Sequence, residues 1–557
     1  MSSPPMTARR VGAHLLVLGC FVLISAAWSY PAVLLDPTRL PGRHFDLLPA
    51  LWLADQAPHV GVDLFHATSA WPEGETLARL DSWVFLALSW LLRPLLSATT
   101  IVGLVAWLGP ALTAFAAERC AALAFGVSRP WSLVAGLATG FSGVMASAAL
   151  EGQVPHLLEP WLPLLLGAAW LASGPGSRLR HGLWAGLGAS LALLTTAYHG
   201  LVAVVVLVGL GLRALTHGWR AVVHLCAALL VLLPVTAWLA LTYRAGDGDA
   251  VPPRRIVDLA RLGSASLDSL LTWTPALDVA GHSVGAPTSA LVAAALLLGW
   301  RTRGARWLLA LAAVGLLLAL GPVWRVGWDS TGVTSPLSFL WLPPLGAVLR
   351  FPVRFAWLTS MCGGVAVALV LHRARPVGRA RAAMLGVALM DVFVVTGMPG
   401  RQGEIALPPA AGERDGAVLD LFGLAAWPEQ SDVEMWARNR SCARQVVHRR
   451  PILERCIGTS VSSPRVRVAG WLLPRLMRPQ GPPADTVRRL AALGVGNVVV
   501  HRDWFRPEDL PVLEAALVEM LGPPVFANGE LVTHRVPGPE TDRGRARRAL
   551  ETMRGRR

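Results

Sequence analysis

The sequence predicts a multi-pass α-helical membrane protein that carries a small soluble α/β domain near its C-terminus. Hydrophobic residues make up 54% of the 557 positions, charged residues make up 15%, and the mean hydropathy is +0.49. This composition is too apolar for one soluble domain. Long apolar runs continue up to residue 398, after which the hydropathy falls. We therefore expect a membrane domain over 1–398, a soluble domain over 399–537 and a basic, disordered tail over 538–557.

About eleven to thirteen apolar runs are candidates for membrane-spanning helices. The first, 11–35, follows Arg9 and Arg10 and is longer than the apolar part of a signal peptide, so we interpret it as an uncleaved helix whose N-terminus lies inside. Further candidates lie at 83–97, 101–115, 131–150, 157–171, 183–197, 201–212, 222–241, 290–300, 307–320, 356–371 and 382–395. The Pro-containing stretch 335–348 is either another span or a re-entrant segment. An odd total would place the C-terminus outside.

The region after residue 398 has the patterns of a small α/β domain. Helical spacing predicts helices over 486–493 and 507–521, and the run Asn-Val-Val-Val-His at 497–501 predicts a strand. Short strands are expected at 525–526 and 531–534, on either side of an Asn-Gly turn. A folded domain of this size is translocated largely regardless of its charge, so we expect it on the external side.

The charges favour a membrane surface over nucleic acid as the partner. All 50 basic residues are arginine, and they outnumber the 35 acidic residues to give a net charge of +15. Arginines cluster in short links at 178–180, 213–220, 301–306 and 373–381. Such positive links are retained on the cytoplasmic side and contact anionic lipid headgroups. Membrane lipid is therefore the expected partner, and nucleic-acid binding is not expected.

Two polar inserts, 36–81 and 243–289, are predicted to be external loops. Asp46 in the first loop follows His44 closely, and a carboxylate at the membrane surface suits a general base acting on an acceptor hydroxyl. The same residue equally suits a helix N-cap or a solvated loop. Asp63 and Asp81 offer hydrogen bonds or metal contacts, but their spacing is not that of a tight metal site. A divalent metal is compatible with this loop, and no metal ligand is assigned.

Other polar residues interrupt the apolar runs. Glu151, His156 and Glu159 lie between two runs, where they either line a polar pocket or cap helices at the interface. The segment Tyr198-His199-Gly200 is interpreted as a short turn, with a ligand contact as the alternative. Arg350 and Arg354, four residues apart, share one helix face and either grip a phosphate or anchor a span.

Several short segments resemble known sequences. They are LALGP at 318–322, LGAVLRFPVRF at 345–355, QVVHRRPI at 445–452, LGVGNVVVH at 493–501 and GQVPHLLEPWLP at 152–163. Together they resemble a bacterial branch of the GT-C type integral membrane glycosyltransferases, which use polyprenyl-phosphate sugars. The resemblance implies a bacterial inner-membrane protein that transfers a sugar at the external face, with Asp46 as the catalytic acid of the first loop. In that loop the family usually has a Gly-Asp pair, whereas this chain has His44-Phe45-Asp46.

An external, periplasmic soluble domain would place Cys442 and Cys456 in an oxidising compartment. They then either form a disulfide or remain two buried thiols, because spacing alone does not give the geometry.

The favoured function is sugar transfer from a polyprenyl-phosphate donor, with Asp46 as the catalytic residue. The expected substrate-binding residues are His44, Asp63, Asp81, Glu151, His156, Glu159, Arg350 and Arg354. No Walker loop, G-x-S-x-G elbow or H-E-x-x-H motif is present, so ATP-driven transport and common hydrolase chemistry lose support. A transporter or flippase of a lipid-linked glycan, for which Glu118 and Asp391 are the suggestive charges, and a non-catalytic assembly protein remain as alternatives.

Overall fold

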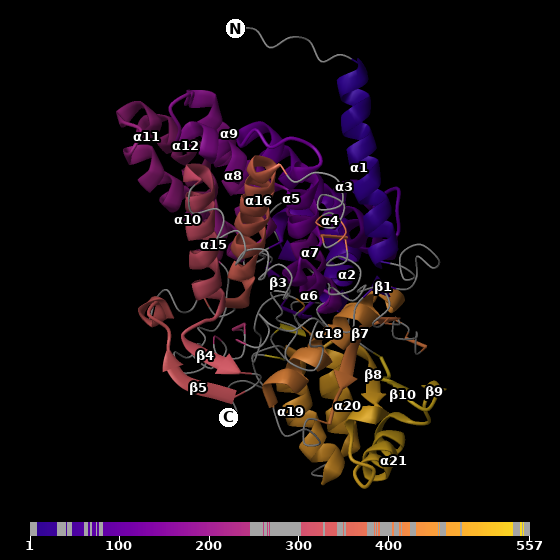
Figure 1. Cartoon of the computed structure of the whole chain (residues 1–557). Coiled ribbons are helices and arrows are strands. Elements are labelled where there is room, and N and C mark those ends of the chain that lie inside the picture. The colour runs from indigo at the N-terminus through magenta and orange to yellow at the C-terminus, as the bar shows by residue number, and fades with distance from the viewer. Residues whose placement is uncertain are drawn as a thin grey trace.

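A helical bundle and a smaller α/β domain at one end of it make up the described part of the chain (Figure 1). A computed structural model describes residues 8–29, 47–60, 82–245, 302–326, 329–341, 352–375, 415–423, 430–454, 464–478 and 482–538, with shorter pieces between them. Most of the two polar inserts, the run 290–300 and most of the run 382–395 lie outside the described residues.

The bundle is built from apolar helices, most of which overlap the predicted runs; the buried helix Leu47–Gln56 instead lies within the insert 36–81 that was predicted to be an external loop. They are α1 (Ala8–Ser29), α2 (Leu47–Gln56), α3 (Trp83–Leu92), α4 (Ala98–Ala124), α5 (Trp131–Gly140), α6 (Gly143–Leu150), α7 (Val154–Leu157), α8 (Trp161–Ala172), α9 (Leu179–Thr195), α10 (Ala197–Leu215), α11 (Trp219–Cys226), α12 (Ala228–Ala245), α15 (Arg303–Ala319) and α16 (Ala356–Ala374). A hairpin of β4 (Val323–Val326) and β5 (Asp329–Thr334) projects toward the soluble end between α15 and α16 (Figure 1).

Within the described residues, six stretches are long and apolar enough to cross a membrane. They are Val11–Ser29, Ala98–Ala124, Trp131–Leu150, Ala197–Leu215, Trp219–Thr242 and Pro352–Ala374, and two shorter apolar helices are Trp83–Leu92 and Gly304–Ala319. The prediction of a multi-pass helical membrane protein is thus confirmed. The segment Tyr198-His199-Gly200 is not a turn, because Thr196 caps α10 just before it and the three residues lie in the first helical turn.

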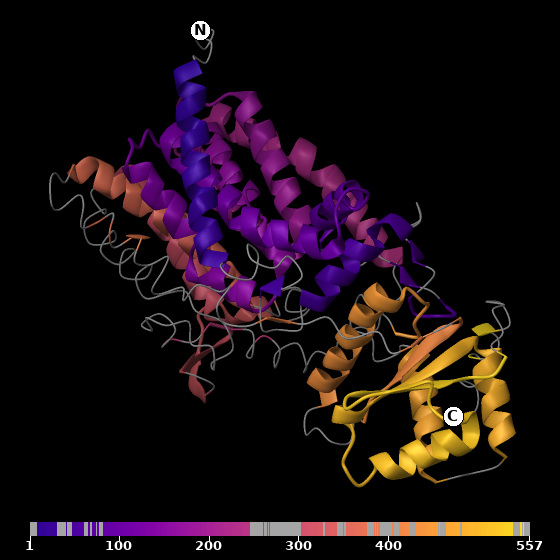
Figure 2. The ribbon, with the colours of Figure 1, turned by 90° about the vertical axis from the view of Figure 1, so that its right-hand side faces the viewer.

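The soluble domain is a four-stranded mixed sheet with helices on both faces (Figure 2). The strand order is β7–β8–β10–β9, with β7 (Ala417–Leu421) parallel to β8 (Val495–His501) and with β10 (Leu531–Arg535) antiparallel to β8 and to β9 (Phe526–Ala527). The helices are α18 (Gln430–His448), α19 (Pro464–Met477), α20 (Pro483–Ala492) and α21 (Leu510–Leu521). The predicted strands and helices of this region are confirmed.

Alternating side chains assign the helices to the two faces of this sheet. Val418, Val499 and Leu531 pack with Cys442 of α18 and with residues of α2. Leu419, Val498, Val500 and Val532 pack with α19, α20 and α21 instead. Two residues of the expected disordered tail, Ala546 and Leu550, are fully buried, so the tail is packed at these positions.

Helix α2, which follows the first part of the first polar insert, lies between the bundle and the soluble domain. Nearly all of its side chains are buried, and it packs against α4 on one side and α18 on the other. The Trp52 indole N–H donates to Gln445 Oε1 at 2.7 Å. Further along the insert, the Trp71 N–H donates to Ile452 O at 2.9 Å, and Glu73 pairs with Arg467 at 2.5 Å. The first insert is therefore part of the interface between the two regions.

Cys442 of α18 and Cys456 form a disulfide, with a Cα–Cα distance of 5.7 Å. Both cysteines are buried beside α2. Of the two alternatives that the sequence left open, the structure has the bonded form.

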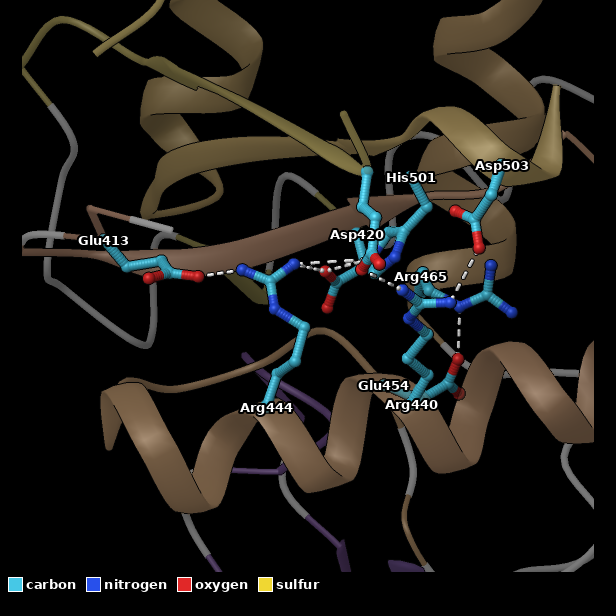
Figure 3. Close-up of polar contacts among 9 residues, drawn as sticks. Glu413, Asp420, Arg440, Arg444, Glu454, Arg465, His501 and Asp503 are labelled. Carbon is cyan, nitrogen blue, oxygen red and sulfur yellow. Dashed lines mark hydrogen bonds and ion pairs between the residues drawn. The ribbon is translucent and has the colours of Figure 1, made fainter. Parts of the chain in front are cut away.

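A buried polar network joins α18 to the parallel strands of the sheet (Figure 3). The Arg444 guanidinium lies between two carboxylates, at 2.7 Å from Asp420 Oδ1 and in direct contact with Glu413. His501 Nε2 lies 2.9 Å from Asp420 Oδ1, and the His501 ring stacks on Phe422 with centroids 4.1 Å apart. Arg444, Asp420 and His501 are each at most 2% exposed. The network therefore holds α18 against the sheet of the soluble domain.

Replacement of Arg444 by Met should destabilise the soluble domain by about 3 to 5 kcal/mol, because it leaves two buried carboxylates without their cation. Amide hydrogen exchange of β8 in the full-length protein measures this loss. The matched control is Arg488→Ala, because Arg488 and its partner Asp485 are both mostly exposed. This variant should change the free energy of unfolding, measured by the same exchange, by about 1 kcal/mol or less. Equal protection of the β8 amides in both variants would contradict a stabilising role of the Arg444 network.

The soluble domain should also lose stability on acidification. Burial lowers the pKa of His501 and of His448 from 6.5 to about 4 each. Because the unfolded chain takes up these protons first, stability is full above about pH 6.5 and is lost as the pH falls toward 4. Calorimetry of the full-length protein at several pH values should show a falling transition temperature, with a weaker pH dependence in the His448→Gln/His501→Gln variant. A transition that rises on acidification would overturn this assignment.

Candidate functional site

Polar side chains, of which Glu159 and His199 are buried and Arg354 is partly buried, gather where three helices of the bundle begin. Glu159 precedes α8, His199 lies in the first turn of α10, and Arg354 lies in η5 (Pro352–Phe355), the short helix that leads into α16. Helix starts expose backbone N–H groups and carry positive partial charge, so their convergence favours an anion. We call the set His156, Glu159, Tyr198, His199, Arg354 and Trp357 the helix-start cluster.

A buried contact between a carboxylate and an imidazole lies at the centre of the helix-start cluster. The Glu159 carboxylate contacts Nδ1 of His199, and both side chains are fully buried. The backbone holds the two partners in place. The Glu159 N–H donates to Thr113 Oγ1 at 3.1 Å, and Thr113 Oγ1 in turn donates to Gly109 O at 2.9 Å. The His199 N–H donates to the capping hydroxyl of Thr196 at 3.1 Å.

Aromatic and cationic groups surround this contact. The His156 and Trp357 rings both approach the His199 ring edge to face, with centroid distances of 5.2 and 5.3 Å. The Arg354 guanidinium lies 4.3 Å from the centroid of the Tyr198 ring. Among the described residues, neither His156 Nδ1 nor His199 Nε2 has a hydrogen-bond partner. The cluster thus combines a buried carboxylate and two buried imidazoles with a partly buried guanidinium.

The structure brings together three of the residues expected to bind substrate: His156, Glu159 and Arg354. Glu151 is only partly buried, and it accepts a hydrogen bond from Gln153 Nε2 at 2.6 Å. The other predicted site residues, His44, Asp46, Asp63, Asp81 and Arg350, lie outside the described residues.

The start of α2 lies close to the segment 151–160, which carries Glu151, His156 and Glu159. Gly152 has a φ of +72°, and a Cβ at this position would lie 2.6 Å from the backbone N of Leu47. Only glycine suits both the left-handed backbone and the close approach. Leu47 directly follows Asp46 in the sequence, so the chain emerging from the first part of the loop reaches the 151–160 segment.

His199, Tyr198 and Trp357 were not among the predicted site residues. The sequence did contain a signal for His199. Thr196 three residues earlier is a preferred N-cap residue, and an apolar run follows, which is the pattern of a helix start. Trp357 carries no such signal, since an aromatic residue in an apolar run is ordinary core.

Glu118, which suggested transport, has a structural role at the opposite end of the bundle. Its fully buried carboxylate accepts from Arg119 Nε at 2.6 Å and from Ser132 Oγ at 2.9 Å, and Arg119 reaches His14 of α1 at 2.9 Å. These contacts tie α1, α4 and α5 together. Asp391 lies outside the described residues. No group of three His, Cys, Asp or Glu within the described ranges is arranged to hold a metal ion.

Comparisons with known proteins find structures with a similar fold but no similar sequence. No family model matches the chain, and no curated protein matches it. The cryo-EM structure of the arabinofuranosyltransferase AftD from Mycobacteria matches with a TM-score of 0.53 at 16% identity, over 95% of this chain and 40% of that chain. The chain therefore spans less than half the length of that protein.

A second match is the crystal structure of the Archaeoglobus fulgidus oligosaccharyltransferase tethered to an acceptor peptide. It has a TM-score of 0.50 at 14% identity and covers 90% of this chain and 72% of that chain. Both matched proteins are GT-C membrane glycosyltransferases, and in each the similarity extends over nearly the whole of this chain. The chain is thus a multi-pass membrane protein with the GT-C fold.

Proposed function

We propose that the protein is a membrane glycosyltransferase that moves a sugar from a polyprenyl-phosphate donor to an acceptor at the external membrane face. The observation that carries this proposal is the helix-start cluster, in which a partly buried guanidinium and two buried imidazoles lie at the end of the bundle nearest the soluble domain. The names of both matched proteins, an arabinofuranosyltransferase and an oligosaccharyltransferase, describe sugar transfer. A donor whose lipid tail lies in the membrane would present its phosphate at one end of such a bundle.

Arg354 is the proposed ligand of the donor phosphate, with Arg350 and His156 as further contacts. Its guanidinium is held against the Tyr198 ring, which limits the conformations available to this long side chain. A planar guanidinium binds two phosphate oxygens at once. Glu151, Asp63, Asp81 and His44 are proposed to contact the sugar or the acceptor, and a divalent metal is compatible with these carboxylates.

Asp46 is the proposed catalytic base for the acceptor hydroxyl. It directly precedes Leu47, whose backbone lies against Gly152 in the segment leading to His156 and Glu159. A base must come within hydrogen-bond reach of the proton that it removes. The approach of Leu47 to this segment supports a shared site for the loop acid and the phosphate ligands.

We propose that the soluble domain is periplasmic and that the bundle lies in the inner membrane. The start of α1 and the soluble domain lie at opposite ends of the bundle (Figures 1 and 2). The end near the start of α1 carries exposed arginines at the helix links, among them Arg129, Arg178, Arg180, Arg220 and Arg375. Positive links stay in the cytoplasm, so this distribution supports an external soluble domain.

Replacement of Asp46 by Asn should lower sugar transfer by at least about 100-fold, since general-base catalysis contributes about that much or more. Arg354→Ala should weaken transfer by roughly 10- to 100-fold through loss of a charged hydrogen-bond donor. Membranes that contain labelled polyprenyl-phosphate sugars allow the loss of label from the lipid fraction to be followed. The control Asp485→Asn should transfer normally. Full activity of Asp46→Asn at normal expression would exclude the proposed base.

Side-specific labelling should distinguish the two ends of the bundle. In spheroplasts, an impermeant maleimide should label Arg488→Cys in the exposed part of the soluble domain without permeabilisation. Arg375→Cys, at the end of α16 near the start of α1, should be labelled only after permeabilisation. The reverse pattern would place the soluble domain in the cytoplasm and would contradict transfer at the external face.

A further inference from the structure

We infer that His199 is a phosphate-binding residue of the helix-start cluster and that Glu159 is its positioning residue. The ligand would be a phosphate ester of the kind that the leaving lipid carrier presents. The inference rests on the proposed function for the identity of that lipid, but phosphate binding is measurable without sugar transfer.

The contact with Glu159 determines which atom of His199 is left for a ligand. Glu159 Oε2 contacts Nδ1, so Nε2 is the ring nitrogen that does not face the carboxylate. In the ion-paired form both ring nitrogens carry protons, and Nε2–H is a hydrogen-bond donor. The residue is fully buried, and Nε2 has no hydrogen-bond partner among the described residues. A buried donor without a partner is unfavourable, and a phosphate oxygen would accept its hydrogen bond.

The surroundings of Nε2 suit an anion. His156, only 7% exposed, lies edge to face with His199 and has a second nitrogen, Nδ1, without a partner among the described residues. Arg354, against Tyr198 of the same helical turn, adds a full positive charge. The position of the cluster at three helix starts adds backbone dipoles of the same sign.

Glu159 acts through His199 and not on the ligand itself. Its Oε2 contacts the imidazole, and its backbone N–H is held by Thr113. In the proposed reaction the bond from the anomeric carbon to the phosphate oxygen breaks, and the bond to the acceptor oxygen forms. The acceptor proton leaves to the base, and the lipid phosphate departs with increased negative charge. His199 would stabilise that charge by a hydrogen bond, and no other reactant is required.

The test compares binding of undecaprenyl phosphate with binding of undecaprenol, its phosphate-free alcohol, to the full-length protein in nanodiscs. His199→Asn places an amide near the position of Nδ1 but removes Nε2. It should weaken undecaprenyl phosphate binding by about 10-fold or more, while undecaprenol binding is unchanged. Glu159→Gln should lower the same preference for the phosphate, because it removes the charge that pairs with the imidazolium. Inorganic phosphate in excess should compete with undecaprenyl phosphate and not with undecaprenol.

His224→Asn is the matched control, since His224 bonds to Ser177 Oγ at 2.9 Å and lies in the last turn of α11, away from the cluster. It should keep the full preference for the phosphate. A purely structural role of the Glu159–His199 pair would lower the thermal stability of the two variants without changing that preference, and this result would overturn the inference. A wild-type protein that binds phosphate and alcohol equally would instead contradict the donor class in the proposed function.

Discussion

The packing of α2 between the bundle and the soluble domain is the constraint on which the rest of the arrangement depends. Its residues are buried against α4 on one side and α18 on the other, and Trp52 donates to Gln445 across the interface. The same helix begins at Leu47, against Gly152. One short segment therefore positions the soluble domain, the end of the acid-bearing loop and the polypeptide that leads to the helix-start cluster.

Burial governs the two polar clusters of the molecule in different ways. In the soluble domain, Arg444 has a carboxylate on each side, so its charge is compensated within the protein. In the membrane region, the Glu159 carboxylate contacts His199, while Nε2 of His199 and Nδ1 of His156 have no hydrogen-bond partner among the described residues. An arginine enclosed by two carboxylates stabilises a domain, whereas buried ring nitrogens without partners at converging helix starts are suited to bind a ligand.

The fold class was predictable because apolar runs, turn residues and alternating strands are local patterns. The strand β8 and its neighbour β10 were recognised from Val-rich runs and an Asn-Gly turn, and the two helices around them from their spacing. The candidate site was predictable only in part. His156, Glu159 and Arg354 stood out as polar residues in apolar surroundings, but no pattern relates residues about 40 and 200 positions apart. His199 was therefore interpreted as a turn residue, and its pairing with Glu159 became visible only in three dimensions.

The contact between Trp52 and Gln445 also has a consequence for how the chain is made. The two residues are 393 positions apart, and ribosomes add about 5 to 20 residues per second. The partner of α2 is thus synthesised roughly 20 to 80 s after α2 itself. During that interval the apolar face that later meets α18 has no protein to cover it. Assembly of this protein therefore requires that α2 rest on the membrane surface or on a chaperone until the last quarter of the chain arrives.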